Sequence, residues 1–461
     1  MPTPGDLFLS PDLTEAEAQA YLGTLGFGDP AAVDGHLQQM ADDPVAREAL
    51  GRLAPDLIHA LLETPDPDAA AMGISHYVAA RTGRAMFLDY LREDPRALHV
   101  LSYVMGASPA LSEILIRTPE YFHWLVAQVE RSAPDRQDHE EELVSAFRSI
   151  DDPLEGLNML RRWKRRETLR IGTRELLRRE TVQAVASQLS DIASVAIDFA
   201  LAIVMRQRLD AEGRDEAPGR FAVIGVGRLG AREMSYSADV GLLYVYDLAT
   251  DAPAEDEFFV RAGADLTTAL AEETHEGSLY RVSPASWARS EGRLKACSLV
   301  EYREHYAGSA EVFERSALAR ACVVGGDADL GHRLVDCIDP FVYAEAAQEK
   351  SVPAEARAGI PLEAPVRVGS REIERFTEEL QVRYGAAHPQ LRRSSTLAAL
   401  EAMSQTGLLD EGVRRELDHA YVFLRSAEHR RELGLTEDAD AALTASQERV
   451  REICRGIAGR P

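Results

Sequence analysis

The pattern of apolar residues changes abruptly near residue 219, and this change constrains the fold more than any other feature of the chain. Residues 153–209 repeat apolar side chains at helical spacing, and the stretch 190–209 has neither proline nor glycine. After a polar linker at 212–219, residues 221–226 form a short apolar run that is typical of a buried strand. The chain therefore joins helical regions to a region that contains a sheet.

The region after the linker is predicted to be a small α/β unit. Residues 240–246 and 279–282 have the composition of strands, and residues 258–273 have helical periodicity between them. A strand, a turn, a strand, a helix and a strand within about 65 residues indicate such a unit.

The regions on both sides of this unit are predicted to be helical. Residues 12–130 alternate helical patterns with breaks that contain Pro30, Pro55, Pro65, Pro67, Pro95, Pro109 and Pro119. The polar stretch 132–140 is predicted to be a connecting loop, and so is 352–368. Residues 411–432 place one apolar face at helical spacing, formed by Val413, Leu417, Ala420, Tyr421 and Leu424.

These patterns predict three parts. They are a helical region at 1–150, the unit with the sheet at 151–335, and a C-terminal helical bundle at 336–461.

The charge balance argues against nucleic acid as a ligand. The chain has 51 basic and 76 acidic residues, a formal net charge of -25. Phosphate backbones are bound by Lys and Arg, and an acidic surface repels them. The basic run at 161–166 lies within a helical pattern and is interpreted as a solvated helix face.

Cysteine usage and the N-terminus indicate a cytoplasmic protein without a membrane partner. None of Cys297, Cys322, Cys337 and Cys454 lies in a CxxC pair, which argues against zinc. The N-terminus has no basic region followed by an apolar stretch. The most apolar stretch, 193–205, is too short to span a bilayer and is predicted to be a buried helix.

Three glycines follow the first predicted strand. Gly225, Gly227 and Gly230 match G-x-G-x-x-G, but no apolar helical run follows them at once, as a dinucleotide site requires. Lys followed by Ser or Thr is missing, so the segment is not a Walker A loop. Such glycines let backbone N–H groups approach phosphate, and they also serve simple turns.

The longer segment 225–242 reads G-V-G-R-L-G-A-R-E-M-S-Y-S-A-D-V-G-L. It resembles the pattern G-x-G-K-L-G-G-R-E-L-x-x-x-S-D-x-D-L of bacterial glutamine synthetase adenylyltransferases, bifunctional enzymes that add AMP to glutamine synthetase and remove it. Further similar segments lie at 108–122, 169–176, 189–193, 313–318, 371–374, 388–392, 407–409 and 420–430. The resemblance thus covers nearly the whole chain, which has length for one of the family's two tandem modules.

The resemblance implies an α+β, predominantly helical fold. A nucleotidyltransferase core of the polymerase-β-like type would be flanked by an N-terminal helical array and a C-terminal helical bundle. The resemblance also implies Mg²⁺ and ATP or ADP as cofactors. Candidate nucleotide-binding residues are Gly227, Arg228, Gly230 and Arg232. For the two arginines, a solvated or salt-bridged role is the alternative.

The metal-binding carboxylates that the resemblance implies are incomplete. In an Asp-x-Asp pair on a strand, both side chains face the same side and can bind the same Mg²⁺. Asp239 occupies the first position, but Gly241 occupies the second, and Ser283 replaces a third carboxylate. Ala285 and Trp287 replace two arginines of the family pattern. Asp239 is the remaining candidate metal ligand, or alternatively caps a turn, and no catalytic residue is predicted beyond these altered positions.

We therefore predict a glutamine synthetase adenylyltransferase-like protein of nitrogen regulation whose AMP transfer and removal are lost or much reduced. It would act by binding a protein partner, either glutamine synthetase or a nitrogen-regulatory signal protein. The alternative is an active nucleotidyltransferase that adenylylates or deadenylylates glutamine synthetase, with Asp239 and other carboxylates holding the metal.

Overall fold

The computed structural model describes residues 2–41, 43–249, 255–284, 289–290, 293–310, 314–344, 369–435 and 440–458. The chain divides into two compact units. Unit 1 contains Met1–Ala133, Arg165–Thr181 and Arg430–Thr436, and unit 2 contains Pro134–Lys164, Val182–His429 and Glu437–Pro461. The division into three domains predicted from the sequence, with boundaries near 150 and 336, stays a prediction.

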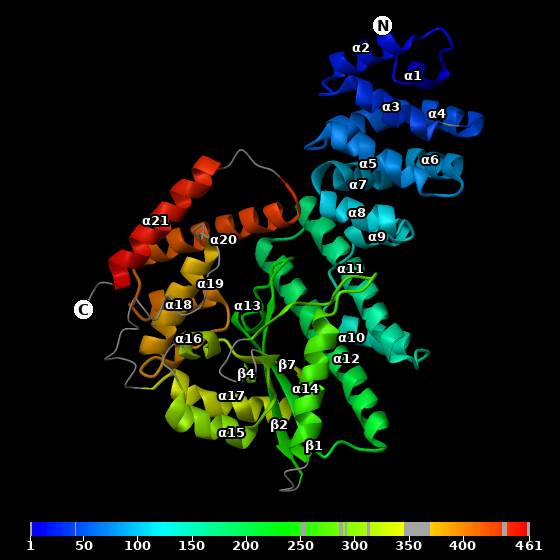
Figure 1. Cartoon of the computed structure of the whole chain (residues 1–461). Helices are drawn as coiled ribbons and strands as arrows, with labels where there is room; N and C mark the ends of the chain where they lie inside the picture. Colours follow the sequence, from blue (N-terminus) through cyan, green and yellow to red (C-terminus); the bar gives the residue numbers. More distant parts are fainter. Residues whose placement is uncertain are drawn as a thin grey trace. The chain divides into compact units, whose positions relative to one another are not determined.

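Unit 1 is an array of short helices (Figure 1). They are α1 (Asp6–Leu9), α2 (Glu15–Leu25), α3 (Pro30–Met40), α4 (Pro44–Leu62), α5 (Pro67–Ala79), α6 (Arg84–Glu93), α7 (Pro95–Ala107), α8 (Pro109–Arg117) and α9 (Tyr121–Val129). Several begin with proline because the missing N–H has no helical partner at that position. The break predicted at Pro55 is wrong, since Pro55 lies inside α4.

The loop predicted at 132–140 is partly wrong. Helix α10 (Arg136–Phe147) begins inside it, with a capping box at its start. The Asp135 side chain accepts from the Asp138 backbone N–H at 2.9 Å, and the Asp138 side chain accepts from the Asp135 backbone N–H at 2.9 Å. Paired capping bonds satisfy the free N–H groups of a first turn, so this polar segment can begin a helix.

Two long helices follow, α11 (Pro153–Leu176) and α12 (Val182–Glu212). Among the described residues, α12 is the one helix long and apolar enough to cross a membrane. Of its most apolar stretch, 72% is buried inside the protein. This confirms the predicted buried helix, because a core helix is covered by its neighbours.

A small mixed sheet lies in unit 2 (Figure 1). Its order is β3-β2-β1-β7, with β6 also paired to β2, and its strands are β1 (Gly219–Val226), β2 (Val240–Leu248), β3 (Val282–Pro284), β6 (Cys297–Ser298) and β7 (Cys322–Gly326). Strand β1 is antiparallel to β2 and β7, whereas β3 and β6 run parallel to β2. A separate short hairpin joins β4 (Arg289–Ser290) to β5 (Arg293–Leu294).

Both faces of the sheet are buried. On one face, Ile224 and Val245 belong to a cluster with residues of α15 (Leu299–Glu304) and α17 (Ala328–Val342). On the other face, the rings of Phe221 and Tyr246 stack on Phe259 of α14 (Asp256–Ala271) at 5.9 and 5.2 Å between centroids. Since successive strand residues face opposite sides, apolar runs without alternation suit these strands. The prediction of an α+β, predominantly helical fold is confirmed.

The C-terminal helices are α18 (Ser370–Tyr384), α19 (Thr396–Gln405), α20 (Glu411–Glu432) and α21 (Asp440–Ala458). The predicted helix 411–432 coincides with α20, and its predicted apolar face lies in a core shared with α18, α19 and α21. The loop predicted at 352–368 lies outside the described residues.

The glycine turn joins β1 to the short helix α13 (Gly227–Gly230). Gly227 has φ +60°, a backbone region that glycine enters without steric cost. A Cβ on Gly230 would lie 2.0 Å from the Arg320 carbonyl oxygen and 2.6 Å from that of Gly225. These glycines are thus required by the backbone, whatever else they bind.

Gly230→Ala tests this requirement. The added methyl group meets backbone on two sides, so we expect the free energy of unfolding to fall by about 3 kcal/mol. Gly227→Ala is the matched control, because a Cβ added there would have no neighbour within 4 Å and only the positive φ opposes it. It should cost about 1 kcal/mol. Urea unfolding followed by circular dichroism measures both values, and equal losses would contradict the steric account.

Candidate functional site

The candidate metal position lies at one end of the sheet. Asp239 directly precedes β2, and Gly241 on β2 is the register partner of Ser283 on β3. The parallel pairing of these two strands therefore brings the three predicted positions together. Only Asp239 supplies a carboxylate there, because glycine has no side chain and serine carries no charge.

Asp239 is already engaged by a cation. Arg281, the residue before β3, donates from Nε to Asp239 Oδ1 at 2.8 Å and from Nη2 to the Ser237 carbonyl at 3.4 Å. The side chains are 75% and 46% exposed, so the pair is screened by solvent and weak. Asp239 makes no turn-capping bond within the described part of the chain.

The described residues do not fit a Mg²⁺ site of the kind that the resemblance implies. Mg²⁺ is held by carboxylates together with substrate phosphates, in near-octahedral geometry. Among these residues, Asp239 joins no group of three potential His, Cys, Asp or Glu ligands. Ala285 and Trp287 lie outside the described residues, and neither has a side chain that could bind a metal or phosphate through charge.

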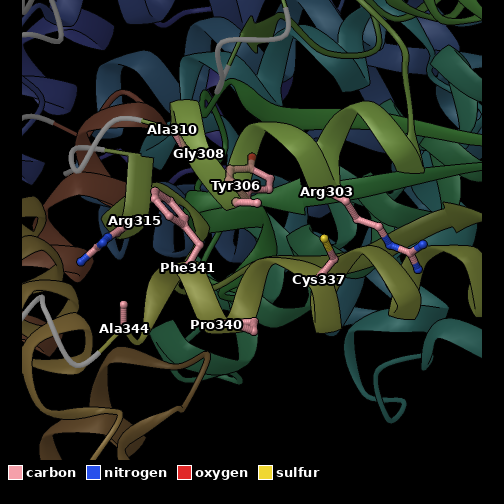
Figure 2. A pocket seen from close by; sticks show the side chains of 10 residues that line it. Arg303, Tyr306, Gly308, Ala310, Arg315, Cys337, Pro340, Phe341 and Ala344 are labelled. Carbon is pink, nitrogen blue, oxygen red and sulfur yellow. The ribbon is translucent and has the colours of Figure 1, made fainter.

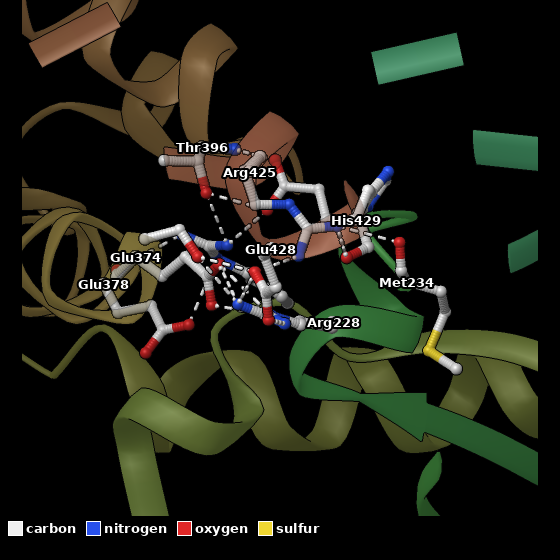
Figure 3. A network of polar contacts seen from close by, with 11 residues as sticks. Arg228, Met234, Glu374, Glu378, Thr396, Arg425, Glu428 and His429 are labelled. Atoms are coloured by element: carbon white, nitrogen blue, oxygen red, sulfur yellow. Dashed lines mark hydrogen bonds and ion pairs between the residues drawn. The ribbon is translucent and has the colours of Figure 1, made fainter. Parts of the chain in front are cut away.

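Arg228, a predicted nucleotide ligand, is held in a buried ion-pair network (Figure 3). Its Nη1 donates to Glu428 Oε1 at 2.6 Å, and its Nη2 donates to Glu374 Oε1 at 3.0 Å and to Ser370 Oγ at 2.8 Å. Only 8% of the side chain is exposed. The salt-bridged alternative therefore describes its contacts, and nucleotide binding by Arg228 stays a prediction.

The charge of Arg228 controls the protonation of its partners. Burial by itself would raise the pKa of Glu428, but the guanidinium groups of Arg228 and Arg425 lower it to about 2. Burial would also raise the pKa of Glu374, but the attraction of Arg228 outweighs it and the pKa of that carboxyl is lowered too. Both groups are consequently ionised at neutral pH, although Glu374 is buried and Glu428 is partly buried.

The network continues through Arg320 to Glu233 and the start of α19. Arg320 Nη1 donates to Glu233 Oε2 at 3.1 Å and to Thr396 Oγ1 at 2.9 Å. Glu233 Oε1 accepts from the Thr396 backbone N–H at 2.7 Å. Arg320 Nε also lies 3.4 Å from Glu378 Oε1. This part of the network ties the segment after the glycine turn to the C-terminal helices.

Among the described residues, the ion pairs of the network join three arginines to four carboxyl groups, namely Arg228, Arg320 and Arg425 to Glu233, Glu374, Glu378 and Glu428. Arg375 adds a further positive charge that acts on Glu378. Burial raises the pKa of Glu378 to about 7, and Arg320 and Arg375 only partly oppose the shift. A carboxyl group that is partly protonated near neutral pH lowers the negative charge of the network.

Arg232 is placed differently from Arg228. It has φ +58° and donates from Nη2 to Asp191 Oδ2 and to Ser187 Oγ, both at 2.8 Å. Half of its side chain is exposed, at 50%. A cavity of about 230 Å³ lies beside it, lined also by Ser395 and Arg425. Arg232 is thus the predicted nucleotide-binding arginine that remains accessible, though paired.

Sequence reasoning missed several residues of this region. Arg281, Ser370, Thr396 and Arg425 were not predicted as partners of the candidate residues, although Arg425 lies in a segment singled out for its resemblance. Arg425 is buried and donates from Nη2 to the carbonyls of Glu233 and Met234 at 2.9 and 2.8 Å. A signal was present, because charged residues interrupt the apolar faces of α18 and α20.

Arg228→Met tests the role of the buried ion pairs. The variant leaves Glu374 and Glu428 without their main cation, so the free energy of unfolding at pH 7 should fall by about 3–5 kcal/mol. The loss should be smaller near pH 5. In the parent, the pKa of Glu428 is lowered to about 2, so this carboxyl stays charged at pH values where an ordinary carboxyl is protonated. Its contribution to the free energy of unfolding is complete above the ordinary carboxyl range and is lost as the pH falls from that range toward about 2. In the variant, buried carboxyls without a cation can take up a proton near pH 5.

Arg232→Met is the matched control from the same turn. Its ion pair is half exposed, and it should cost less than about 1 kcal/mol at either pH. Urea unfolding at the two pH values measures both variants. Equal losses in the free energy of unfolding for the two variants would show that the Arg228 ion pairs stabilise the fold no more than the exposed Arg232 pair does.

Comparisons with known proteins identify the family of the chain. The family model "Glutamate-ammonia ligase adenylyltransferase" matches residues 98–336. Three bacterial proteins named bifunctional glutamine synthetase adenylyltransferase/adenylyl-removing enzyme are similar to the chain. The identity is 29% over 445 residues in Corynebacterium efficiens, 31% over 428 in Streptomyces avermitilis and 27% over 470 in Chromobacterium violaceum.

The alignments cover most of this chain but only part of each relative. They include 90%, 88% and 97% of the chain and 42%, 41% and 52% of the three relatives, in the same order. The chain thus spans about half the length of these relatives, or less. Because the family model matches more than half of the chain, the chain belongs to the glutamate-ammonia ligase adenylyltransferase family.

Proposed function

We propose that this chain is a regulatory member of its family in which adenylyl transfer and removal are lost or much reduced. The observation that carries the proposal is the pairing of Gly241 with Ser283 beside a single carboxylate, Asp239. Catalysis of phosphoryl and nucleotidyl transfer depends on metal ions and cations that stabilise charge in the transition state. A site with one exposed carboxylate, paired to Arg281, lacks the ligands for that task.

The proposed mode of action is binding to a protein of nitrogen regulation in the cytoplasm. The relatives' names point to glutamine synthetase as the protein they modify. A member without transfer activity can still recognise this enzyme, or a nitrogen-regulatory signal protein, through surfaces away from the nucleotide. The formal charge of -25 disfavours nucleic acid in that role.

The first test is a transfer assay. The protein is incubated with glutamine synthetase, labelled ATP and Mg²⁺, and separately with adenylylated glutamine synthetase and phosphate. We expect no turnover above background in either direction, because the metal ligands are missing. A bifunctional relative is the positive control. Robust Mg²⁺-dependent turnover that Asp239→Asn abolishes would establish the active-enzyme alternative instead.

The second test rebuilds the metal site. Gly241→Asp with Ser283→Asp places two carboxylates on paired strands beside Asp239, so Mn²⁺ affinity should rise at least about 10-fold over the parent. We expect no gain in transfer, because Ala285 and Trp287 still stand in place of arginines. Paramagnetic relaxation of water protons measures Mn²⁺ binding.

The matched control for the rebuilt site is Gly241→Asn with Ser283→Asn, which adds similar volume without charge. Mn²⁺ affinity of this variant should equal that of the parent. If the Asp and Asn variants bind equally, the three positions do not converge on one cation.

A further inference from the structure

A second cavity lies in unit 2, formed by the helices that follow β6. Its volume is about 440 Å³. It is lined by Arg303 at the end of α15, Tyr306 in the π-helix η2 (His305–Ser309), Arg315 in α16 (Glu314–Leu318), and Cys337 and Phe341 in α17. Arg315 belongs to the segment 313–318 that the sequence singles out, yet it has no part in the candidate nucleotide site.

The cavity carries positive charge in an acidic protein. Its lining includes Arg303 and Arg315 and contains no Asp or Glu among the described residues. Neither arginine makes an ion pair in the described part of the chain, whereas Arg228, Arg232 and Arg320 all do. Two cations without carboxylate partners among the described residues stand out in a chain with a net charge of -25.

Arg315 packs on the Phe341 ring but has no carboxylate partner among the described residues. Its Nε is buried and has no hydrogen-bond partner among the described residues. Burial lowers the pKa of its guanidinium. The neighbouring carboxylate is directed elsewhere, because Glu314 lies 3.1 Å from His305 Nε2 in a buried pair. An anion bound in the cavity would supply a negative charge that the described residues around Arg315 do not.

Aromatic rings line the space between the two arginines. Figure 2 shows Tyr306 and Phe341 between Arg303 on one side and Arg315 on the other. The ring centroids of Tyr306 and Phe341 are 5.2 Å apart with planes inclined by 32°, and the Arg315 guanidinium carbon lies 5.0 Å from the Phe341 centroid. Tyr306 is buried and stacks on Tyr302 at 6.0 Å between centroids, so the partly exposed Phe341 offers the apolar surface against which a planar ligand can pack, with Tyr306 behind it.

The helices around the cavity are irregular at the places where they line it. Tyr306 lies in a π-helical turn, which the bond from the Ala310 N–H to the His305 carbonyl closes at 3.0 Å. Pro340, inside α17, also lines the cavity. Single π-helical turns occur frequently at functional sites, and proline within a helix removes one backbone hydrogen bond.

We propose that this cavity binds a small aromatic anion, with a carboxylate or phosphate on Arg315 and a planar body against Tyr306 and Phe341. Arg303 contributes from the opposite end through its positive field. This site is separate from the candidate nucleotide site, since the two share no lining or ligand residue. The ligand must carry both a negative charge and an aromatic ring, because the charge would contact the arginines and the ring would contact the aromatic side chains of the cavity.

The test uses four probes on the whole chain. They are 2-naphthoate and 1-naphthyl phosphate as aromatic anions from the two possible sources, 1-naphthol as a neutral ring, and inorganic phosphate as an anion without a ring. Isothermal titration should show binding of at least one aromatic anion at least about 10-fold tighter than naphthol and phosphate, because a charge-assisted contact is added to ring burial. Binding of both would leave the anionic group unselective, and binding of one would identify it.

Variants locate the binding. Arg315→Met should weaken the preferred anion about 10-fold or more, Phe341→Leu by several-fold, and Arg303→Met by less than Arg315→Met, since it acts from the far end. Arg333→Met is the matched control, because Arg333 lies on the same helix α17, pairs with Asp247 at 2.7 Å and does not line the cavity. Circular dichroism and thermal unfolding confirm that each variant is folded.

Several results would overturn the proposal. Failure of both aromatic anions to bind at millimolar concentration would refute it, and so would equal binding of naphthol. The same holds if inorganic phosphate binds as tightly as the aromatic anions, or if Arg315→Met and Arg333→Met behave alike.

Discussion

The ion pairs of Arg228 with Glu374 and Glu428 are the interaction on which the arrangement of unit 2 around the glycine turn depends. They connect the helix that follows β1 to α18 and α20, which come about 140 to 200 residues later in the chain. Arg228 and Glu374 are buried and Glu428 is partly buried, and charges removed from water stabilise a fold only when they are paired. Removal of the cation would leave two carboxylates without their partner, which lowers the free energy of unfolding. The turn and the C-terminal helices are therefore energetically coupled.

This coupling reduces the number of hydrogen-bond donors that the glycine turn can offer to a bound nucleotide. Arg228 lies where the family resemblance predicts contact with a nucleotide, but its donors are directed to carboxylates and to Ser370. A phosphate would have to compete with the carboxylates of Glu374, which is buried, and Glu428, which is partly buried, for the same guanidinium. At the nearby sheet end, Asp239 is engaged by Arg281, and its two expected companions are Gly241 and Ser283. These contacts support the proposed loss of nucleotide transfer, because the guanidinium of Arg228 is paired and the metal position holds one carboxylate.

Much of the fold could be predicted from the sequence, because local patterns determine it. Apolar runs located β1 and β2, and periodicity located α20 over its full length. Strand β7 was not predicted, since Cys322–Gly326 is short and glycine-rich and is fixed by its pairing with β1. The start of α10 was missed because a capping box, and not an apolar pattern, begins that helix. The positions 239, 241 and 283 could be found by resemblance, but the side-chain partners of Asp239 and of Arg228 could not. Arg281 reaches Asp239 only through the parallel pairing of β3 with β2, and Glu374 reaches Arg228 across 146 residues.

The central claim is that the remaining carboxylate does not hold a catalytic metal. Electron paramagnetic resonance of free Mn²⁺ measures this directly, with the unaltered protein titrated into Mn²⁺ and ATP. The account predicts that the signal falls no further than it does with ATP and an Asp239→Asn variant, because Asp239 is a single exposed ligand paired to Arg281. A stoichiometric loss of the free Mn²⁺ signal that requires Asp239 would contradict the account and show that a working metal centre persists.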